Sequence, residues 1–425
     1  MEMKRMEGKI SFESFMPGTG GDLFAKIEGL AAHLGTHVEP CLEALGHELL
    51  TAAGPQTTVR DLHGRQRRVV MMGSNSFLNL AMHPQVTAAA KAAVDRFGYG
   101  MGAVPVYAGT TDLHRELEQA IARFLHREDA ILFPCGYSGN VGLISALCGP
   151  GDVILNDAAN HASIFDGGQL SGADLQVYLH GNMRHLAKQL RRLPESQEGR
   201  LIVTDGVFSM DGDLAPLAEI CDLAEQYGAR VMVDDAHGIG VVGPTGRGTP
   251  EACGCLERVD VLYGTLSKAP AGIGGYCAGS AALIRYLRLY ARTFFFSTSL
   301  PAPVVAGLLE VFKLLETDQA GRRQLWANIE YLKAGLAQQG LDTGHSASAI
   351  VPVMVRDEVK LGRLHAALLE EGVFTNIVSY PAVRRKDCRL RLNVMANHTP
   401  TDLDHVIATL GTLGRELGIV VGGGE

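Results

Sequence analysis

Short apolar segments alternate with amphipathic helical segments from about residue 65 to residue 300. Most of the apolar segments have no hydrophilic residues at alternate positions, which is typical of parallel strands that are buried on both faces. Helical spacing in between predicts βαβ units and a mostly parallel sheet, so the expected fold class is α/β. The expected strands are Ala130–Phe133, Val153–Leu155, Leu175–Tyr178, Leu201–Thr204, Arg230–Val233, Val261–Tyr263 and Gly275–Ala278.

The pattern changes on either side of this region. Residues 1–60 are mixed and polar, with helical spacing from Leu23 to Leu50, and we interpret them as an N-terminal arm. Helical spacing without strong breaks runs from Pro303 to about Leu336, and two strand–helix pairs follow. We therefore expect an arm at 1–60, a large domain at 61–300, a long linking helical region at 301–340 and a smaller α+β domain at 341–425.

Composition narrows the function classes. The 425 residues contain 38 Lys+Arg and 46 Asp+Glu, a net charge of −8, which argues against a nucleic-acid binder. The sequence has no apolar run long enough to span a membrane and no apolar leader, so we expect a cytoplasmic protein. Its eight cysteines are scattered, which favours reduced thiols. Only Cys253 and Cys255 form a close pair, and we expect no metal site.

Two motifs with candidate binding residues directly follow expected strands. Phe133–Asn140 ends a strand with a turn at Gly136 and begins a helix, whose free N–H groups favour an anion near Gly136 and Tyr137. An ordinary βα turn would look the same. Asp234 ends an apolar strand and His237 follows three residues later, close enough to share one ligand; an N-cap Asp with a surface His is the alternative.

Two further motifs supply a lysine and an arginine. Lys268 lies among small residues after Thr265, between two apolar segments. A buried lysine has a lowered pKa and suits imine formation with an aldehyde, whereas a surface lysine in a glycine-rich loop is the alternative. In Cys388–Leu392, alternation places Arg389 and Arg391 on one face of a strand. A guanidinium there suits a carboxylate, unless the strand is a solvent-facing edge.

The four motifs together indicate a particular ligand more specifically than any one of them does alone. An anion cradle, a buried acid, an imine-forming lysine and a carboxylate clamp occur in that order along an α/β chain. Pyridoxal 5′-phosphate (PLP) requires this set, because its phosphate, its pyridine nitrogen and its aldehyde each need a partner. The combination predicts a PLP site.

With these motifs, the sequence resembles the α-oxoamine synthases, a branch of the fold-type-I PLP enzymes that includes 8-amino-7-oxononanoate synthase and serine palmitoyltransferase. The resemblance covers residues 60–415 and is most specific in Val207–Asp213 together with Asp234–Gly238. It implies a fold-type-I PLP-dependent transferase, with a large, mostly parallel sheet domain sandwiched by helices and a smaller α+β C-terminal domain.

The resemblance also implies roles around the cofactor. Lys268 forms the imine, Asp234 pairs with the pyridinium nitrogen and His237 bonds the phenolic oxygen. His161 stacks on the ring and Ser209 lies beside it. Two further groups follow from the resemblance: the phosphate partners of the same subunit, and those contributed by the neighbouring subunit of a homodimer with shared active sites. The first are Gly136, Tyr137 and Thr265, and the second are Ser297 and Thr298.

The substrate assignment follows from the same resemblance. Arg391 and Asn75 grip the carboxylate of a small L-amino acid, which is serine, glycine or alanine. That amino acid condenses with an acyl thioester on CoA or an acyl-carrier protein, giving an α-amino ketone, CO2 and free thiol. A fold-type-I aminotransferase and a non-catalytic partner subunit are the alternatives. The apolar loop Gly100–Tyr107 departs from the family pattern, so the substrate pair stays open.

Overall fold

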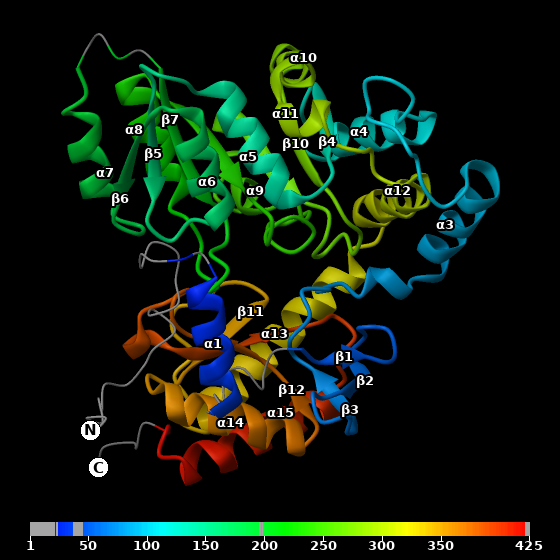
Figure 1. The fold of residues 1–425 in the computed structure, drawn as a ribbon, viewed down its shortest axis with the longest axis vertical. Helices are drawn as coiled ribbons and strands as arrows, with labels where there is room; N and C mark the ends of the chain where they lie inside the picture. The colour runs from blue at the N-terminus through cyan, green and yellow to red at the C-terminus, as the bar shows by residue number, and fades with distance from the viewer. Residues whose placement is uncertain (1–21, 23, 37–45, 195–196, 198, 421–425) are drawn as a thin grey trace.

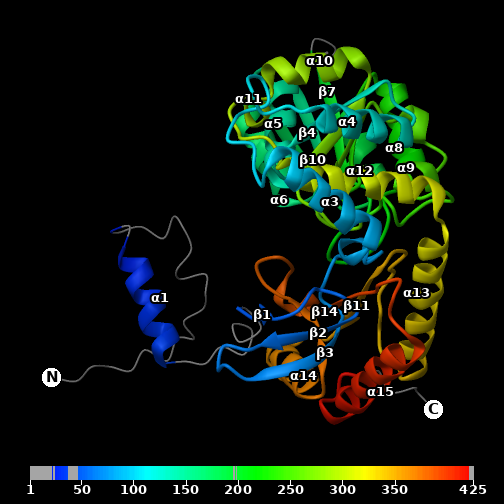
Figure 2. The ribbon, with the colours of Figure 1, turned by 90° about the vertical axis from the view of Figure 1, so that its right-hand side faces the viewer.

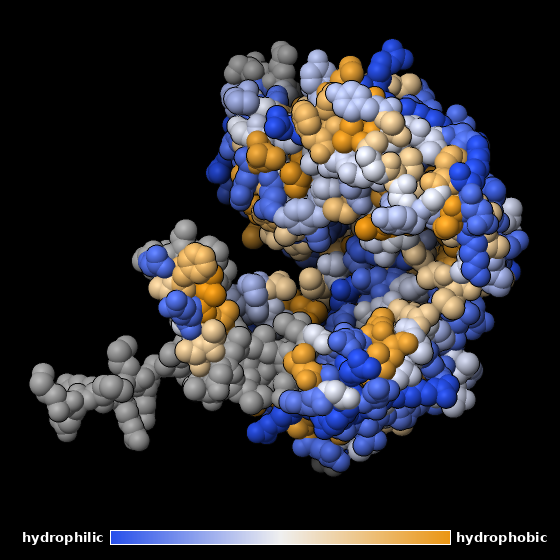
Figure 3. Space-filling model, turned by 45° about the vertical axis from the view of Figure 1, so that its right-hand side comes forward, coloured by the Kyte–Doolittle hydropathy of each residue, from blue (hydrophilic) through white to orange (hydrophobic). Residues whose placement is uncertain are grey.

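The computed structural model describes residues 22, 24–36, 46–194, 197 and 199–420. Two groups of elements stand one above the other in Figure 1, with helices on both faces of a large sheet in the upper group and two smaller sheets in the lower group. Helix α1 (Ala25–Thr36) is set apart from the sheets in Figure 2. Between the upper and lower groups the surface is hollowed (Figure 3).

A seven-stranded sheet forms the centre of the upper group and confirms the predicted α/β class. All neighbours pair in parallel except β10, which is antiparallel to both of its neighbours. A buried parallel sheet explains the continuous apolar segments of the sequence. The strand order is β4 (Asp129–Phe133), β10 (Gly275–Gly279), β9 (Val261–Thr265), β8 (Arg230–Asp234), β7 (Arg200–Asp205), β5 (Val153–Asp157) and β6 (Asp174–Tyr178).

Helices cover both faces of this large sheet. Successive residues of β5 enter different cores, since Ile154 packs in one cluster and Val153 and Leu155 pack in the other. The first cluster includes residues of α5 (Gly136–Leu147), α6 (Ala162–Ser171), α10 (Ala281–Tyr290) and α11 (Arg292–Phe295). The second includes residues of α4 (Asp112–Phe124), α7 (Met183–Leu190), α8 (Leu217–Tyr227) and α12 (Ala302–Thr317).

The lower group contains a three-stranded antiparallel sheet, which we call the C-terminal sheet. Its order is β11 (Ile350–Met354), β14 (Arg389–Asn393), β13 (Asn376–Val378). Leu390 and Leu392 of β14 are fully buried. The helices of this group are α13 (Ala320–Gln338), α14 (Glu358–Glu370) and α15 (Pro400–Glu416).

The predicted boundary at residue 60 is wrong, because it falls inside a β-hairpin. Strand β2 (Gln56–Arg60) pairs with β3 (Gln66–Met71), and β3 pairs in parallel with β12 (Val373–Phe374). With β1 (Glu48–Leu49) these strands form a four-stranded sheet that joins the N-terminal and C-terminal residues. The helical spacing expected as far as Leu50 ends at Thr36, and the predicted start at Leu23 lies outside the described residues.

The continuous helix expected from Pro303 to Leu336 is also wrong. Asp318 ends α12, and its carboxylate accepts a hydrogen bond from Ala320 N (2.8 Å) at the start of α13. Helix α12 packs on α3 (Pro84–Phe97). None of the helices in the described part of the chain is long and apolar enough to span a membrane. The short helices are η2 (Leu80–Met82), α9 (Thr249–Ala252), η3 (Leu256–Arg258) and η4 (Arg385–Asp387).

Candidate active site

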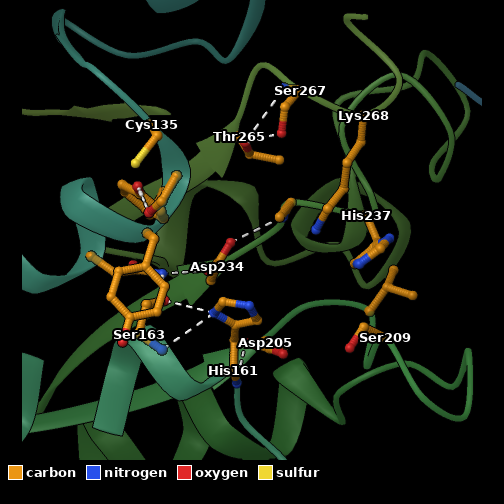
Figure 4. A pocket seen from close by; sticks show the side chains of 16 residues that line it. Cys135, His161, Ser163, Asp205, Ser209, Asp234, His237, Thr265, Ser267 and Lys268 are labelled. Atoms are coloured by element: carbon orange, nitrogen blue, oxygen red, sulfur yellow. Dashed lines mark hydrogen bonds between the residues drawn. The ribbon is translucent and has the colours of Figure 1, made fainter. Parts of the chain in front are cut away.

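A cavity of about 240 Å³ opens at the carboxyl ends of β7, β8 and β9. Asp205, Asp234 and Thr265 are the last residues of these three strands, so parallel pairing brings their side chains to one edge of the sheet. Figure 4 shows Lys268 pointing into this cavity from the loop after β9. The predicted residues that line it are Gly136, Tyr137, His161, Ser209, Asp234, His237, Thr265 and Lys268.

Asp234 is held by neighbours from two elements. The Asn140 side chain donates a hydrogen bond to Asp234 Oδ2 (2.7 Å), and Ala236 N donates to Oδ1 (3.1 Å). The second amide hydrogen of Asn140 is donated to Ser163 Oγ (2.9 Å). Both oxygens of the buried carboxylate are therefore oriented by this chain before any ligand arrives.

The same network continues to His161. Ser163 N donates to His161 Nδ1 (3.3 Å), and the Ser163 hydroxyl lies 2.7 Å from the same nitrogen. Nδ1 is thus the acceptor, which leaves the ring proton on Nε2. Burial lowers the pKa of His161, so the imidazole is neutral near pH 7.

Lys268 and His237 complete the polar lining. Burial lowers the pKa of the Lys268 ammonium to about 8, although Asp234 and Asp205 oppose this shift. His237 is buried, and its Nδ1 has no hydrogen-bond partner among the described residues. Burial places the pKa of His237 well below its ordinary value. A neutral ring with an unpartnered buried nitrogen indicates a polar ligand atom in the cavity.

The part of the cavity between the start of α5 and Thr265 suits a phosphate. Helix α5 begins at Gly136, and a Cβ atom at that position would lie 2.9 Å from Thr265 Oγ1. The glycine therefore leaves room between the helix start and the threonine, where free N–H groups favour an anion. With Lys268 for the aldehyde, Asp234 for the ring nitrogen and His237 for a ring substituent, the residues fit PLP.

Asn75 and Arg391 lie together but do not line this cavity. Arg391 Nη2 donates to Asn75 Oδ1 (2.7 Å), and Asn393 Nδ2 donates to the same oxygen (3.2 Å). Burial lowers the pKa of Arg391 to about 10, and its charge lowers the pKa of both Lys268 and His237. Arg391 Nε has no partner among the described residues, which leaves a donor for a carboxylate.

Ser297 and Thr298 do not line the cavity. They follow α11, where Ser297 is half-buried and Thr298 is exposed. The sequence reasoning also missed lining residues, and Asn140, Ser163 and Asp205 are the most important. Asn140 is the last residue of the Phe133–Asn140 motif, but only its burial in the structure distinguishes it from a surface asparagine of a helix.

The sequence pattern of the family described as "Aminotransferase class I and II" matches residues 67–410. The chain belongs to this family. Within it, the chain is an α-oxoamine synthase with the fold-type-I architecture, as the sequence motifs predicted, and PLP is its cofactor.

Three relatives illustrate the place of the chain in the aminotransferase class I and II family. The 8-amino-7-oxononanoate synthase of Symbiobacterium thermophilum is 45% identical over 354 residues, which are 83% of this chain and 90% of the relative. Serine palmitoyltransferase from S. paucimobilis, solved with a bound PLP–myriocin aldimine, superposes with a TM-score of 0.88 at 33% identity, over 94% of this chain and 100% of that structure. The 8-amino-7-oxononanoate synthase of Francisella tularensis gives a TM-score of 0.69 at 26% identity, over 82% and 97%.

Proposed function

We propose that the chain condenses serine, glycine or alanine with an acyl thioester on CoA or an acyl-carrier protein. A carbon–carbon bond forms between the amino acid Cα and the acyl carbonyl, the thiol leaves, and the amino acid carboxyl group departs as CO2. The product is an α-amino ketone. The proposal is carried by the cavity with Lys268 and Asp234, and by the Arg391–Asn75 pair, whose guanidinium charge acts on Lys268 and His237. Relatives named for such syntheses support it.

The cofactor and amino acid would be held by different parts of the chain. Thr265 and the helix start at Gly136 and Tyr137 would hold the phosphate, Asp234 the ring nitrogen and His237 the phenolic oxygen. Ser209 would lie beside the ring and His161 over its face. Arg391, oriented by Asn75, would hold the amino acid carboxylate.

PLP, when bound, withdraws electrons from the amino acid Cα. Lys268 Nζ, whose pKa of about 8 gives a substantial neutral fraction near pH 7.5, would take the Cα proton. His161 carries its proton on Nε2, so it would donate a hydrogen bond to the thioester carbonyl oxygen as negative charge develops there. Asn140 would keep Asp234 and His161 oriented through both steps.

Ser297 and Thr298 would serve the neighbouring subunit of a homodimer. Thr298 is exposed, and neither residue lines the cavity formed by the chain's own side chains, which supports that assignment. A cytoplasmic location is part of the same proposal. In its support, no two cysteines of the described part form a disulfide.

The direct test offers carboxyl-labelled serine, glycine and alanine to the PLP-loaded protein with acyl-CoA and acyl-carrier-protein donors of varied chain length. We expect one amino acid to release labelled CO2 and free thiol in equal amounts, and the Lys268→Ala variant to release neither. Transfer of the amino group to a 2-oxo acid without CO2 would instead identify an aminotransferase. A non-catalytic subunit would turn over no combination.

A further inference from the structure

Residues 206–214, the first part of the connection from β7 to α8, carry Ser209 into the cavity. Its backbone closes on itself, because Phe208 N donates to Asp213 O (3.0 Å) and Gly212 N donates to Phe208 O (2.8 Å). We call residues 206–214 the site loop. Asp211, Gly212 and Asp213 belong to its specific sequence motif, yet none of them lines the cavity.

One side of the site loop is attached to the large-sheet group of elements. His180, which follows β6, lies 3.0 Å from Asp213 Oδ2 and 2.9 Å from Asp157 Oδ1. Its ring also packs edge-on against Phe208, with 4.3 Å between ring centroids. The hydrogen bond with Asp157, followed by that with Asp213, raises the pKa of His180 to about 10. The imidazole is therefore a cation that holds the loop to the sheet near pH 7.

The other side of the loop is attached to the C-terminal sheet. Arg389 of β14 pairs with Asp211, and its guanidinium also donates to Met210 O (3.3 Å). Ala347 N donates to Gly212 O (2.9 Å). Gly212 has a φ of +73°, and a Cβ there would collide with Ile350 O of β11, so only glycine allows this close approach.

Arg389 connects this contact to the amino acid clamp. It lies two residues before Arg391 on β14, and the alternation of a strand places both side chains on the same face. Only 5% of the Arg389 side chain is exposed, and its Nε donates to Asp387 O (2.8 Å). A desolvated guanidinium that bonds three groups at once fixes their relative positions, because its planar donors are rigid.

We propose that Asp211 and Arg389 are positioning residues that set the distance between the Arg391 clamp and the site loop, and thereby select ligands that carry a carboxylate next to the reacting carbon. This inference rests on the proposed function, since it assumes that Arg391 binds the amino acid carboxylate. Neither residue touches the cavity; both act through β14 and the loop. The ion pair joins two groups of elements that approach each other at the substrate site.

The experiment uses PLP-loaded full-length protein and the variants Asp211→Asn, Arg389→Lys and Asp211→Glu. The matched control is Asp342→Asn, which breaks the Asp342–Arg356 pair (2.5 Å) beside β11, away from the loop. Binding of serine, glycine and alanine is followed by the visible absorption of the bound cofactor. The amines that correspond to them without the carboxylate serve as probes of the same cavity.

We expect Asp211→Asn and Arg389→Lys to bind the amino acid about tenfold more weakly, while affinity for the amine without the carboxylate stays unchanged. The variant that combines Asp211→Asn with Arg389→Lys should lose no more amino acid affinity than either single variant, because both substitutions remove the same contact. Asp211→Glu, which keeps the charge, should recover part of the affinity. Asp342→Asn should leave both affinities as in the unaltered protein.

The readouts separate the two proposals. If the variants lower the melting temperature but bind the amino acid normally, or lose both probes equally, the pair is only structural and the inference is overturned. If the unaltered protein itself shows no absorption change with any of the three amino acids, the proposed function fails. Should Asp211→Asn not fold, Arg389→Lys and Asp211→Glu supply the same comparison.

Discussion

The two halves of the active site are built in different ways. In the cofactor half, Asp234 and His161 are oriented by Asn140 and Ser163, all from the carboxyl edge of the large sheet or the helices beside it. In the amino acid half, Arg391 of the C-terminal sheet meets Asn75, which is 316 positions away in the sequence. The first half is one preorganised edge of a sheet; the second joins two segments that lie far apart in the sequence.

Cofactor geometry and amino acid binding therefore depend on different parts of the chain. Buried hydrogen-bond networks within one sheet give fixed geometry, as cofactor chemistry requires. The clamp depends on few side-chain contacts between β14 and the segment that follows β3, so its position is easier to alter. Variants of the two halves should therefore have separable effects on cofactor binding and amino acid binding.

The largest effect is expected from Lys268→Ala in the cofactor half. Without the amine, the aldehyde has no covalent partner and the Cα proton has no base, so turnover should fall by about 10⁴-fold. Mass spectrometry after borohydride treatment should show no added cofactor, whereas the unaltered protein gains it. Trapping at another lysine would contradict the assignment of Lys268.

Asn140→Ala should weaken PLP binding by about ten- to a hundredfold, since it removes a hydrogen bond to the buried Asp234 carboxylate and another to Ser163. Fluorescence titration of the apoprotein with PLP measures this. Amino acid affinity of the fully loaded variant should change less than PLP affinity does; the reverse order would remove the distinction between the two halves.

Asn75→Ala should produce the opposite pattern. Arg391 loses its 2.7 Å partner, so amino acid binding should weaken by about tenfold while PLP affinity stays unchanged. Absorption titration of the loaded protein gives the amino acid affinity, and fluorescence titration of the apoprotein gives the PLP affinity. An equal loss of PLP affinity would show that the clamp and the cofactor half are one unit.

The smallest effect is expected from His180→Gln and depends on pH. The folded-state pKa of about 10 is raised above the ordinary value of 6.5, so the stabilisation is complete below about pH 6.5 and is lost as pH rises toward 10. The unaltered protein should lose more stability between pH 7 and 10 than the variant does. Urea unfolding at each pH measures this, and parallel curves would exclude a charged His180.

The cofactor half could be predicted from sequence because its residues end consecutive strands of one kind of sheet. Asp234 and Thr265 are the last residues of β8 and β9, and parallel pairing of these neighbouring strands brings both positions to one edge. Asn140 was overlooked because a helical asparagine has an ordinary surface explanation. Only its burial against Asp234 reveals its contact.

The remaining features depend on long-range packing that no local pattern contains. Alternation on β14 placed Arg389 and Arg391 on the same face, yet it could not show that Asp211 covers one and Asn75 the other. The hairpin of β2 and β3 was assigned to an arm and a large domain because its partner, β12, comes some 300 residues later in the sequence. Turn chemistry at Asp318, a single residue, ended a helix that periodicity predicted to continue.

The parallel pairing of β3 with β12 has a consequence for biosynthesis. Residues 66–71 leave the ribosome long before residues 373–374 exist, so one edge of the hairpin has no partner during most of translation. An open strand edge with apolar residues such as Val69 and Val70 is prone to intermolecular pairing. Chains truncated before Val373 should therefore aggregate even when the large sheet has already folded.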